Sequence, residues 1–225
     1  MTRSVLFDTE TTGLDPLLGD RLIEVAALEL ENDLPTGRHF HALVDPQRDI
    51  PAEATRVHGI TASEVVGKPL FAEIAGGLLE FLGDGKLIAH NAPFDFGFLN
   101  AEFGRLGLPS LDPDRMVDTL ILAKQRFPGM PNSLDALCRR FDIDLTLRTT
   151  HNALLDCRLL ADVYVELTGG RQRGLSLAGD KAQSNVAVYQ SAGPRTPRPV
   201  RPTREELDAH KAFVGKLKDA VWVLE

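Results

Sequence analysis

The sequence predicts an α/β protein in which one mixed β-sheet is flanked by helices and a flexible tail ends in a short helix. Three observations lead to this fold class. Apolar runs near the N-terminus, broken by outward charges, are typical of consecutive strands. Two later apolar runs are short, and each leads directly into a helical pattern. A segment rich in proline and arginine then separates residues 203–225 from the rest of the chain.

The length and composition fit one sizeable core with an appendage. The chain has 225 residues, of which 43% are hydrophobic and 25% charged, as is ordinary for a globular protein. No apolar run approaches the roughly 18 residues needed to span a bilayer, and the N-terminus lacks a signal-peptide pattern. We therefore expect a cytoplasmic protein with no membrane partner. Cys138 and Cys157 are isolated and fall in predicted helices, so buried reduced thiols are expected rather than a disulfide.

The first elements are three predicted strands that form an antiparallel meander. Residues 3–7 make the first strand, 22–31 the second and 38–44 the third. Pro35 and Gly37 are expected to form the turn between the second and third strands.

Helices alternate with two short strands over the middle of the chain. The first predicted elements are a helix at 52–57, a helix from Thr61 or Ser63 to Leu82 interrupted by Pro69, and a strand at 86–89. A helix from Pro93 to about Leu106 follows, and then a strand at 116–119 with a helix to Phe127. The last two are a helix capped by Ser133 that runs through Phe141 and a helix capped by Asn152 that runs to about Leu167.

Two carboxylates follow the first strand directly. Residues at i and i+2 of a strand point to the same face, so Asp8 and Glu10 should converge, with Gly13 closing the turn behind them. Carboxylates held this close repel, and a shared proton or a divalent cation relieves the repulsion. An all-oxygen site favours magnesium or manganese over zinc. The alternative is a solvated acidic pair at a strand end, so the metal interpretation depends on further acids downstream.

Further acids begin two of the predicted helices. Asp95 lies in the first turn of the helix that follows strand 86–89, at the end of the strand where ligands of open α/β sheets collect. Asp156 lies one turn inside the helix capped by Asn152, and His151 lies in the loop just before it. Asp95 could instead serve only to stabilise its own helix through the helix dipole.

The spacing of these residues resembles that of the DEDD exonucleases in their histidine form. The motifs DTETTG at 8–13, HNAPFDFGFLN at 90–100 and HNALLDC at 151–157 match that family in order, and the resemblance spans residues 5–168. It implies a ribonuclease H-like fold and a 3′→5′ exonuclease site that holds two divalent cations, Mg²⁺ or Mn²⁺.

The resemblance also implies a role for each residue of the site. Asp8 would bridge both cations, Glu10 and Asp156 would complete the first, and Asp95 would support the second, through water. His151 would act as general base on the metal-bound water, a role suited to its near-neutral pKa. Contacts with the terminal nucleotide are expected from Thr11, Leu14, His58, His90, Asn91 and Phe94. Phe94 and Phe98 are equally well interpreted as core residues.

Charge is unevenly distributed along the chain. Residues 1–170 carry 15 Lys and Arg against 26 Asp and Glu, whereas residues 171–225 carry 10 against 6. A protein that holds long duplex nucleic acid by its phosphates would normally be basic. If residues 1–170 act on a polynucleotide, they should hold only a short end, with bound cations offsetting the local negative field.

The predicted organisation is an exonuclease domain at 1–170, a linker at 171–202 and an amphipathic segment at 203–225 that contains Trp222. This layout resembles the epsilon proofreading subunits of bacterial DNA polymerase III. By that resemblance Gln172, Leu175 and Leu177 would bind the sliding clamp, although a final aromatic residue is missing, and the last segment would bind the polymerase alpha subunit. Trp is a frequent interface anchor, and a flexible tether raises the effective concentration at the primer end.

The expected function is proofreading: hydrolysis of the terminal phosphodiester of single-stranded or frayed DNA 3′ ends, with release of nucleoside monophosphates. Two alternatives remain open from the residues alone. One is a free-standing exoribonuclease like ribonuclease T or oligoribonuclease, and the other is a structural subunit without catalysis.

Overall fold

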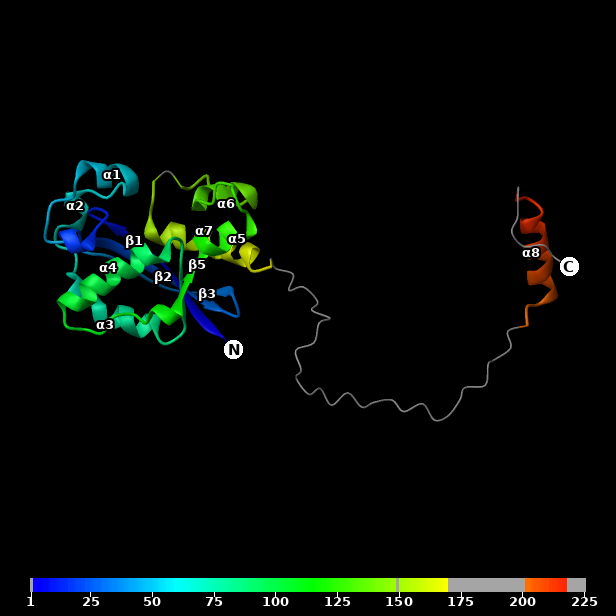
Figure 1. The fold of residues 1–225 in the computed structure, drawn as a ribbon, viewed down its shortest axis with the longest axis horizontal. Coiled ribbons are helices and arrows are strands. Elements are labelled where there is room, and N and C mark those ends of the chain that lie inside the picture. The colour runs from blue at the N-terminus through cyan, green and yellow to red at the C-terminus, as the bar shows by residue number, and fades with distance from the viewer. Residues whose placement is uncertain (1, 149, 170–200, 218–225) are drawn as a thin grey trace, which may run out of the picture. The chain divides into compact units, whose positions relative to one another are not determined.

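A five-stranded mixed sheet forms the centre of the larger of two units (Figure 1). The computed structural model describes residues 2–148, 150–169 and 201–217. In the order β3-β2-β1-β4-β5, the strands are Leu34–Leu43, Leu22–Glu31, Arg3–Thr11, Lys86–Ala89 and Met116–Asp118. The first three strands along the chain pair antiparallel, and β4 and β5 run parallel to β1. The predicted α/β class with a mixed sheet is confirmed.

The turn between β2 and β3 differs from the prediction. It is made by Asn32 and Asp33, which have positive φ values of 51° and 67°, as a tight hairpin turn requires of its two central residues. Pro35 and Gly37, the predicted turn residues, lie inside β3, which starts earlier than expected. The short polar pair accomplishes the reversal because Asn and Asp tolerate the left-handed region.

Strand β1 continues four residues beyond its predicted end at Phe7, to Thr11. Asp8 pairs with Ala26 and Glu10 pairs with Glu24 in the ladder with β2. Both predicted acids are therefore part of the sheet and not of a loop that follows it. Their common orientation is held by backbone hydrogen bonds.

Helices cover the sheet and the ends of its strands. They are α1 at Ala52–His58, α2 at Ala62–Val65, α3 at Phe71–Leu82, α4 at Ala92–Arg105, α5 at Thr119–Arg126, α6 at Leu134–Arg140 and α7 at Ala153–Leu167, with short 3₁₀ turns at Pro16–Leu18 and Pro113–Arg115. A further helix, α8 at Arg204–Val214, is separate from this unit in the sequence. Ser133 and Asn152 cap α6 and α7 as predicted. The predicted interruption at Pro69 is confirmed: Gly67, at φ 76°, and Pro69 separate α2 from α3.

Alternating side chains of β1 enter two different cores. Val5 and Phe7 pack with α3 and α4 on one face of the sheet, whereas Leu6 packs with α6 and α7 on the other. Cys138 and Cys157 are buried in the second core as free thiols, as predicted. Since Asp8 and Glu10 continue the alternation of Leu6, they face the α7 side.

Helix α8 belongs to the second unit. Thr203 and Glu206 form the predicted capping box, in which each side chain bonds the other residue's backbone amide. None of the residues of α8 is buried. Among the described residues, no helix is long and apolar enough to cross a membrane. Residues 171–200 of the predicted linker, with the clamp-binding candidates Gln172, Leu175 and Leu177, lie outside the described residues.

Candidate active site

Side chains at the end of β1 point to both faces of the sheet. Asp8 and Glu10 face α7, while Thr9 between them faces α4. There the Thr9 hydroxyl donates a 2.7 Å hydrogen bond to Oδ1 of Asp95. One three-residue stretch therefore contributes two acids directly and orients a third.

Asp95 is placed by the junction between β4 and α4. Asn91 adopts a left-handed conformation at φ 65°, which turns the chain sharply from the strand into the helix. Asp95 then falls in the first turn of α4 and is 3% exposed. Burial raises the pKa of Asp95 to about 7, although the hydrogen bond from Thr9 opposes the shift.

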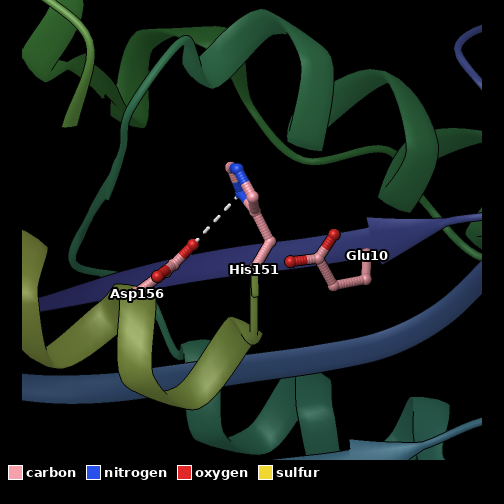
Figure 2. A group of neighbouring side chains, drawn as sticks. All are labelled: Glu10, His151 and Asp156. Atoms are coloured by element: carbon pink, nitrogen blue, oxygen red, sulfur yellow. Dashed lines mark ion pairs between the residues drawn. The ribbon is translucent and has the colours of Figure 1, made fainter. Parts of the chain in front are cut away.

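The N-terminus of α7 brings the other two predicted residues to the site. Oδ1 of Asn152 accepts from the backbone amide of Leu155 and starts the helix. His151 precedes the cap, and its Nδ1 lies 3.4 Å from Oδ2 of Asp156 (Figure 2). One ligand atom from each of Glu10, His151 and Asp156 lies within 4.8 Å of the others. Figure 2 shows the three side chains, with Glu10 on β1, Asp156 on α7 and His151 in the loop just before α7.

The carboxylates repel one another strongly. Burial, and next the charge of Asp95, raise the pKa of Asp8 well above its usual value. Burial, followed by the charges of Asp156 and Glu24, raises the pKa of Glu10 to about 8. The carboxyl group of Glu10 therefore keeps its proton at neutral pH unless a positive charge joins it.

One positive charge is already present, on Arg148. Its Nε and Nη2 donate to the two oxygens of Asp156 at 2.6 and 2.7 Å, and its Nη1 donates to Asp135 at 2.6 Å. Nη2 also lies 3.0 Å from Nδ1 of His151. Although burial alone would raise it, the pKa of Asp156 is lowered by the hydrogen bonds from Arg148 and His151.

The donor set suits a hard divalent cation. The carboxylate oxygens of Asp8, Glu10, Asp95 and Asp156 outnumber the single imidazole, and oxygen-rich sites of this kind bind Mg²⁺ or Mn²⁺. Burial is the main cause of the raised pKa values of Asp8, Glu10 and Asp95, and neighbouring carboxylates raise them further; cations would neutralise this negative charge.

A cleft of about 1310 Å³ opens above these acids. Its lining includes all five predicted catalytic residues and all six predicted nucleotide contacts: Asp8, Glu10, Asp95, His151 and Asp156, with Thr11, Leu14, His58, His90, Asn91 and Phe94. Segments that are distant in the sequence thus meet at one concave surface.

The six nucleotide-contact candidates differ in their surroundings. Leu14 is 85% exposed, whereas His58 is 5% exposed. Nδ1 of His90 lies 2.9 Å from the Thr119 hydroxyl. The Phe94 ring packs on Phe98, with ring centroids 4.9 Å apart. Phe98 itself is buried in the core and does not line the cleft.

Several residues that line the cleft were not predicted. They include Val57, Lys124, Met130, Asp135 and Arg148. Arg148 lies three residues before His151 in a loop, and nothing in the local sequence distinguishes it from other surface arginines. Its role is visible only where the chain folds back on Asp156.

Comparison with known proteins identifies the family. Residues 5–164 match the family model described as Exonuclease (RNase_T). The chain is 44% identical over 221 residues to the DNA polymerase III subunit epsilon of Rickettsia felis, with 96% of each chain covered. It is 39% identical over 223 residues to the subunit of the same name from Escherichia coli, covering 94% of this chain and 92% of the relative.

Solved structures agree with this assignment. Exonuclease X in complex with 5′-overhanging duplex DNA is 27% identical, with a TM-score of 0.58 over 75% of this chain and 91% of that one. The nuclease domain of 3′hExo, a DEDDh family member bound to rAMP, shares the fold with a TM-score of 0.60 at 18% identity, over 74% and 91% of the two chains. The chain therefore belongs to the Exonuclease family, among the proofreading 3′→5′ exonucleases of the DNA polymerase III epsilon type.

Proposed function

We propose that the cleft binds two divalent cations, Mg²⁺ or Mn²⁺, and hydrolyses the terminal phosphodiester of a DNA 3′ end. The observation that carries this proposal is the convergence of Glu10, His151 and Asp156 within 4.8 Å, beside two further buried or half-buried acids. When bound, a pair of cations activates a water molecule and stabilises the leaving 3′ oxygen.

Each acid of the site is assigned to one or both of the proposed cations. Asp8, at the centre of the acids, is assigned to both cations, and Glu10 and Asp156 to the first. Asp95, oriented by Thr9, supports the second. Burial, followed by neighbouring negative charges, raises the pKa of Asp8 and Glu10, and bound cations would lower it again, so both residues would hold the cations as carboxylates.

His151 is assigned as the general base. Its side chain is half exposed at the mouth of the cleft, where a substrate and water can reach it. A neutral imidazole accepts a proton at a ring nitrogen, so His151 can take the proton of the attacking water. Asp156 beside it then stabilises the resulting imidazolium.

The nucleotide contacts follow from the chemistry of the lining. Nδ1 of His58 accepts a hydrogen bond from the amide of Ile60 at 3.0 Å, so the ring proton lies on Nε2. That Nε2 is buried and has no partner among the described residues, and burial lowers the pKa of His58, which keeps the ring neutral. We assign it to donate to a sugar or phosphate oxygen, with the exposed Leu14 contacting the terminal base.

The remaining candidates surround the same nucleotide. Thr11, His90, Asn91 and Phe94 line the same cleft as the acids. His90 is oriented by Thr119 and Asn91 by Asp118, so both are held in place by α5 and its cap. We assign these four residues to position the sugar and phosphate.

The tail is proposed to attach the exonuclease to the replicative polymerase. Leu207 and Phe213 of helix α8 and Leu217 just after it are exposed, and we assign these apolar side chains to the alpha subunit. Gln172, Leu175 and Leu177 are assigned to the sliding clamp. We propose that the protein acts with these partners in the cytoplasm, as expected of a subunit that takes part in DNA replication.

The direct test is degradation of 5′-labelled single-stranded DNA and of RNA of the same sequence. With Mg²⁺ or Mn²⁺ the DNA should shorten stepwise from its 3′ end, and excess chelator should stop the reaction. DNA with a mismatched 3′ end should be shortened faster than a fully paired duplex. RNA degraded much faster than DNA would instead identify an RNA-trimming enzyme.

A further inference from the structure

A fifth carboxylate, Glu24, lies beside the acids of the active site. It is directly opposite Glu10 in the β1–β2 ladder, so the two side chains point to the same face of the sheet. Glu24 is only 1% exposed and does not line the cleft. A buried carboxylate needs hydrogen-bond donors, and the donors to Glu24 indicate its structural role.

Both oxygens of Glu24 bind the start of α7. Oε2 accepts from the backbone amide of Ala153 at 3.1 Å, and Oε1 accepts from Nδ2 of Asn152 at 3.0 Å. Nε2 of His41, on β3, lies 2.7 Å from Oε1. Three donors therefore occupy the two oxygens, and the carboxylate also faces the positive end of the helix dipole.

Asn152 connects Glu24 to the helix with both halves of its amide. Its Oδ1 accepts from Leu155 as the N-cap, while its NH₂ group donates to Glu24. The residue before Asn152 is His151, and Asp156 lies in the first turn after it. The position of this turn relative to β1 sets the distances from His151 and Asp156 to Glu10.

We propose that Glu24 is a positioning residue for the cation site: it fixes the first turn of α7 against the sheet so that Glu10, His151 and Asp156 converge. The inference rests on the proposed cation site and adds a residue that does not itself ligate. Hydrogen-bonded groups behind metal ligands typically change metal affinity or activity by roughly 10–100-fold when they are removed.

The test is the isosteric variant Glu24→Gln in the full chain. One of the two oxygens becomes an NH₂ group, which cannot accept a hydrogen bond. The variant therefore loses the hydrogen bond from the Ala153 amide or the one from the Asn152 side chain, depending on which oxygen is replaced. We expect Mn²⁺ affinity, measured by calorimetry without DNA, to fall by roughly tenfold or more. The kcat on single-stranded DNA should fall by a similar factor, and KM should change by less than about twofold, since the cleft lining is untouched.

Glu29→Gln is the matched control on the same strand. Glu29 is 6% exposed and binds Arg3, Thr36 and Arg38, far from the cleft. This variant should lose thermal stability and keep the Mn²⁺ affinity and kcat of the wild type. Unchanged Mn²⁺ affinity in Glu24→Gln would overturn the proposal. A loss of Mn²⁺ affinity in Glu29→Gln would also overturn it, because reduced stability alone would then explain the weaker binding.

A second variant covers the case in which Glu24→Gln does not fold. Asn152→Ser keeps a good N-cap oxygen and deletes the amide that donates to Glu24. It should weaken Mn²⁺ binding in the same direction, and wild-type affinity here would overturn the proposal. If the wild-type protein itself binds no Mn²⁺, the cation site has failed rather than the role of Glu24.

Discussion

At the scale of single residues, the site is a group of acids that the fold holds closer together than their charges favour. Burial and mutual repulsion raise the pKa of Asp8, Glu10 and Asp95, whereas Arg148 stabilises the ionised form of Asp156. The acids assigned to function therefore lower the stability of the metal-free protein, and two thermal-unfolding experiments can measure this effect.

Replacing Asp8 by Ala should separate catalysis from folding. The variant loses the carboxylate assigned to both cations, so exonuclease activity should fall at least about a thousandfold, or roughly 4 kcal/mol of transition-state stabilisation. Its Tm in chelator should match or exceed that of the wild type, because one repelling acid has been removed. Retained activity in this variant would contradict the assignment of Asp8, and circular dichroism would check that the fold is intact.

The metal-free protein should lose stability as pH rises from about 4.5 to 8. Glu10 has a folded-state pKa of about 8 against an ordinary value of 4.5, so in this range the folded protein binds more protons than the unfolded chain. Asp95, raised to about 7, acts in the same direction. Thermal unfolding in chelator across this range tests the sign, and Glu10→Gln should flatten the slope. Added Mn²⁺ should raise Tm more at pH 8 than at pH 5.

At the scale of elements, the start of α7 is the most constrained part of the site. Asn152 caps the helix, Glu24 attaches it to β2, and Arg148 draws the preceding loop onto Asp156 and Asp135. The loop of Arg148 and the first turn of α7 therefore form one connected unit. Helix α4 is simpler, since one left-handed Asn91 and the hydrogen bond from Thr9 suffice to place Asp95.

Arg148→Gln should destabilise the metal-free protein. The side chains of Arg148 and Asp156 are 8% and 4% exposed, and removing one partner of a buried ion pair costs about 3–5 kcal/mol. Saturating Mn²⁺ should recover part of the lost Tm, because a cation replaces the missing charge beside Asp156. Arg139→Gln, an exposed arginine on α6, is the control and should change stability by at most about 0.5 kcal/mol. Equal effects of the two variants would argue against this ion pair as a stabilising contact.

At the scale of the whole molecule, catalysis and attachment are assigned to different parts of the chain. Residues 1–170 carry a net charge of −11 and residues 171–225 carry +4. An acidic exonuclease unit holds long DNA weakly by itself, so the tail is expected to provide proximity to the primer end rather than additional catalysis.

A chain that ends at Gly169 should keep its exonuclease activity and fail to co-purify with the polymerase alpha subunit. Activity on single-stranded DNA should stay within about twofold of the full chain, because every residue assigned to the cleft is retained. In the full-length protein, Phe213→Ser should weaken polymerase binding in the same way, since it removes an exposed apolar group of α8. Undiminished association of the shortened chain would exclude the tail as the tether.

Local signals in the sequence determined much of the fold and the identity of the principal site residues. Apolar runs predicted the strands, and Ser133, Asn152 and Thr203 predicted helix starts, because capping acts within three or four residues. The order of the DTETTG, HNAPFDFGFLN and HNALLDC motifs indicated the family, which the comparisons confirm. The turn at Asn32 and Asp33 was missed since Pro35 and Gly37 are equally strong local signals.

Only the tertiary structure decided which residues support the acids. Thr9 binds Asp95 across 86 positions, and Glu24 binds Ala153 across 129. Arg148 lies near its partners in sequence, but a loop arginine has no preferred partner until α7 and the sheet have packed. Such contacts depend on which faces of distant elements meet, and that is set by the burial of the two cores rather than by any local pattern.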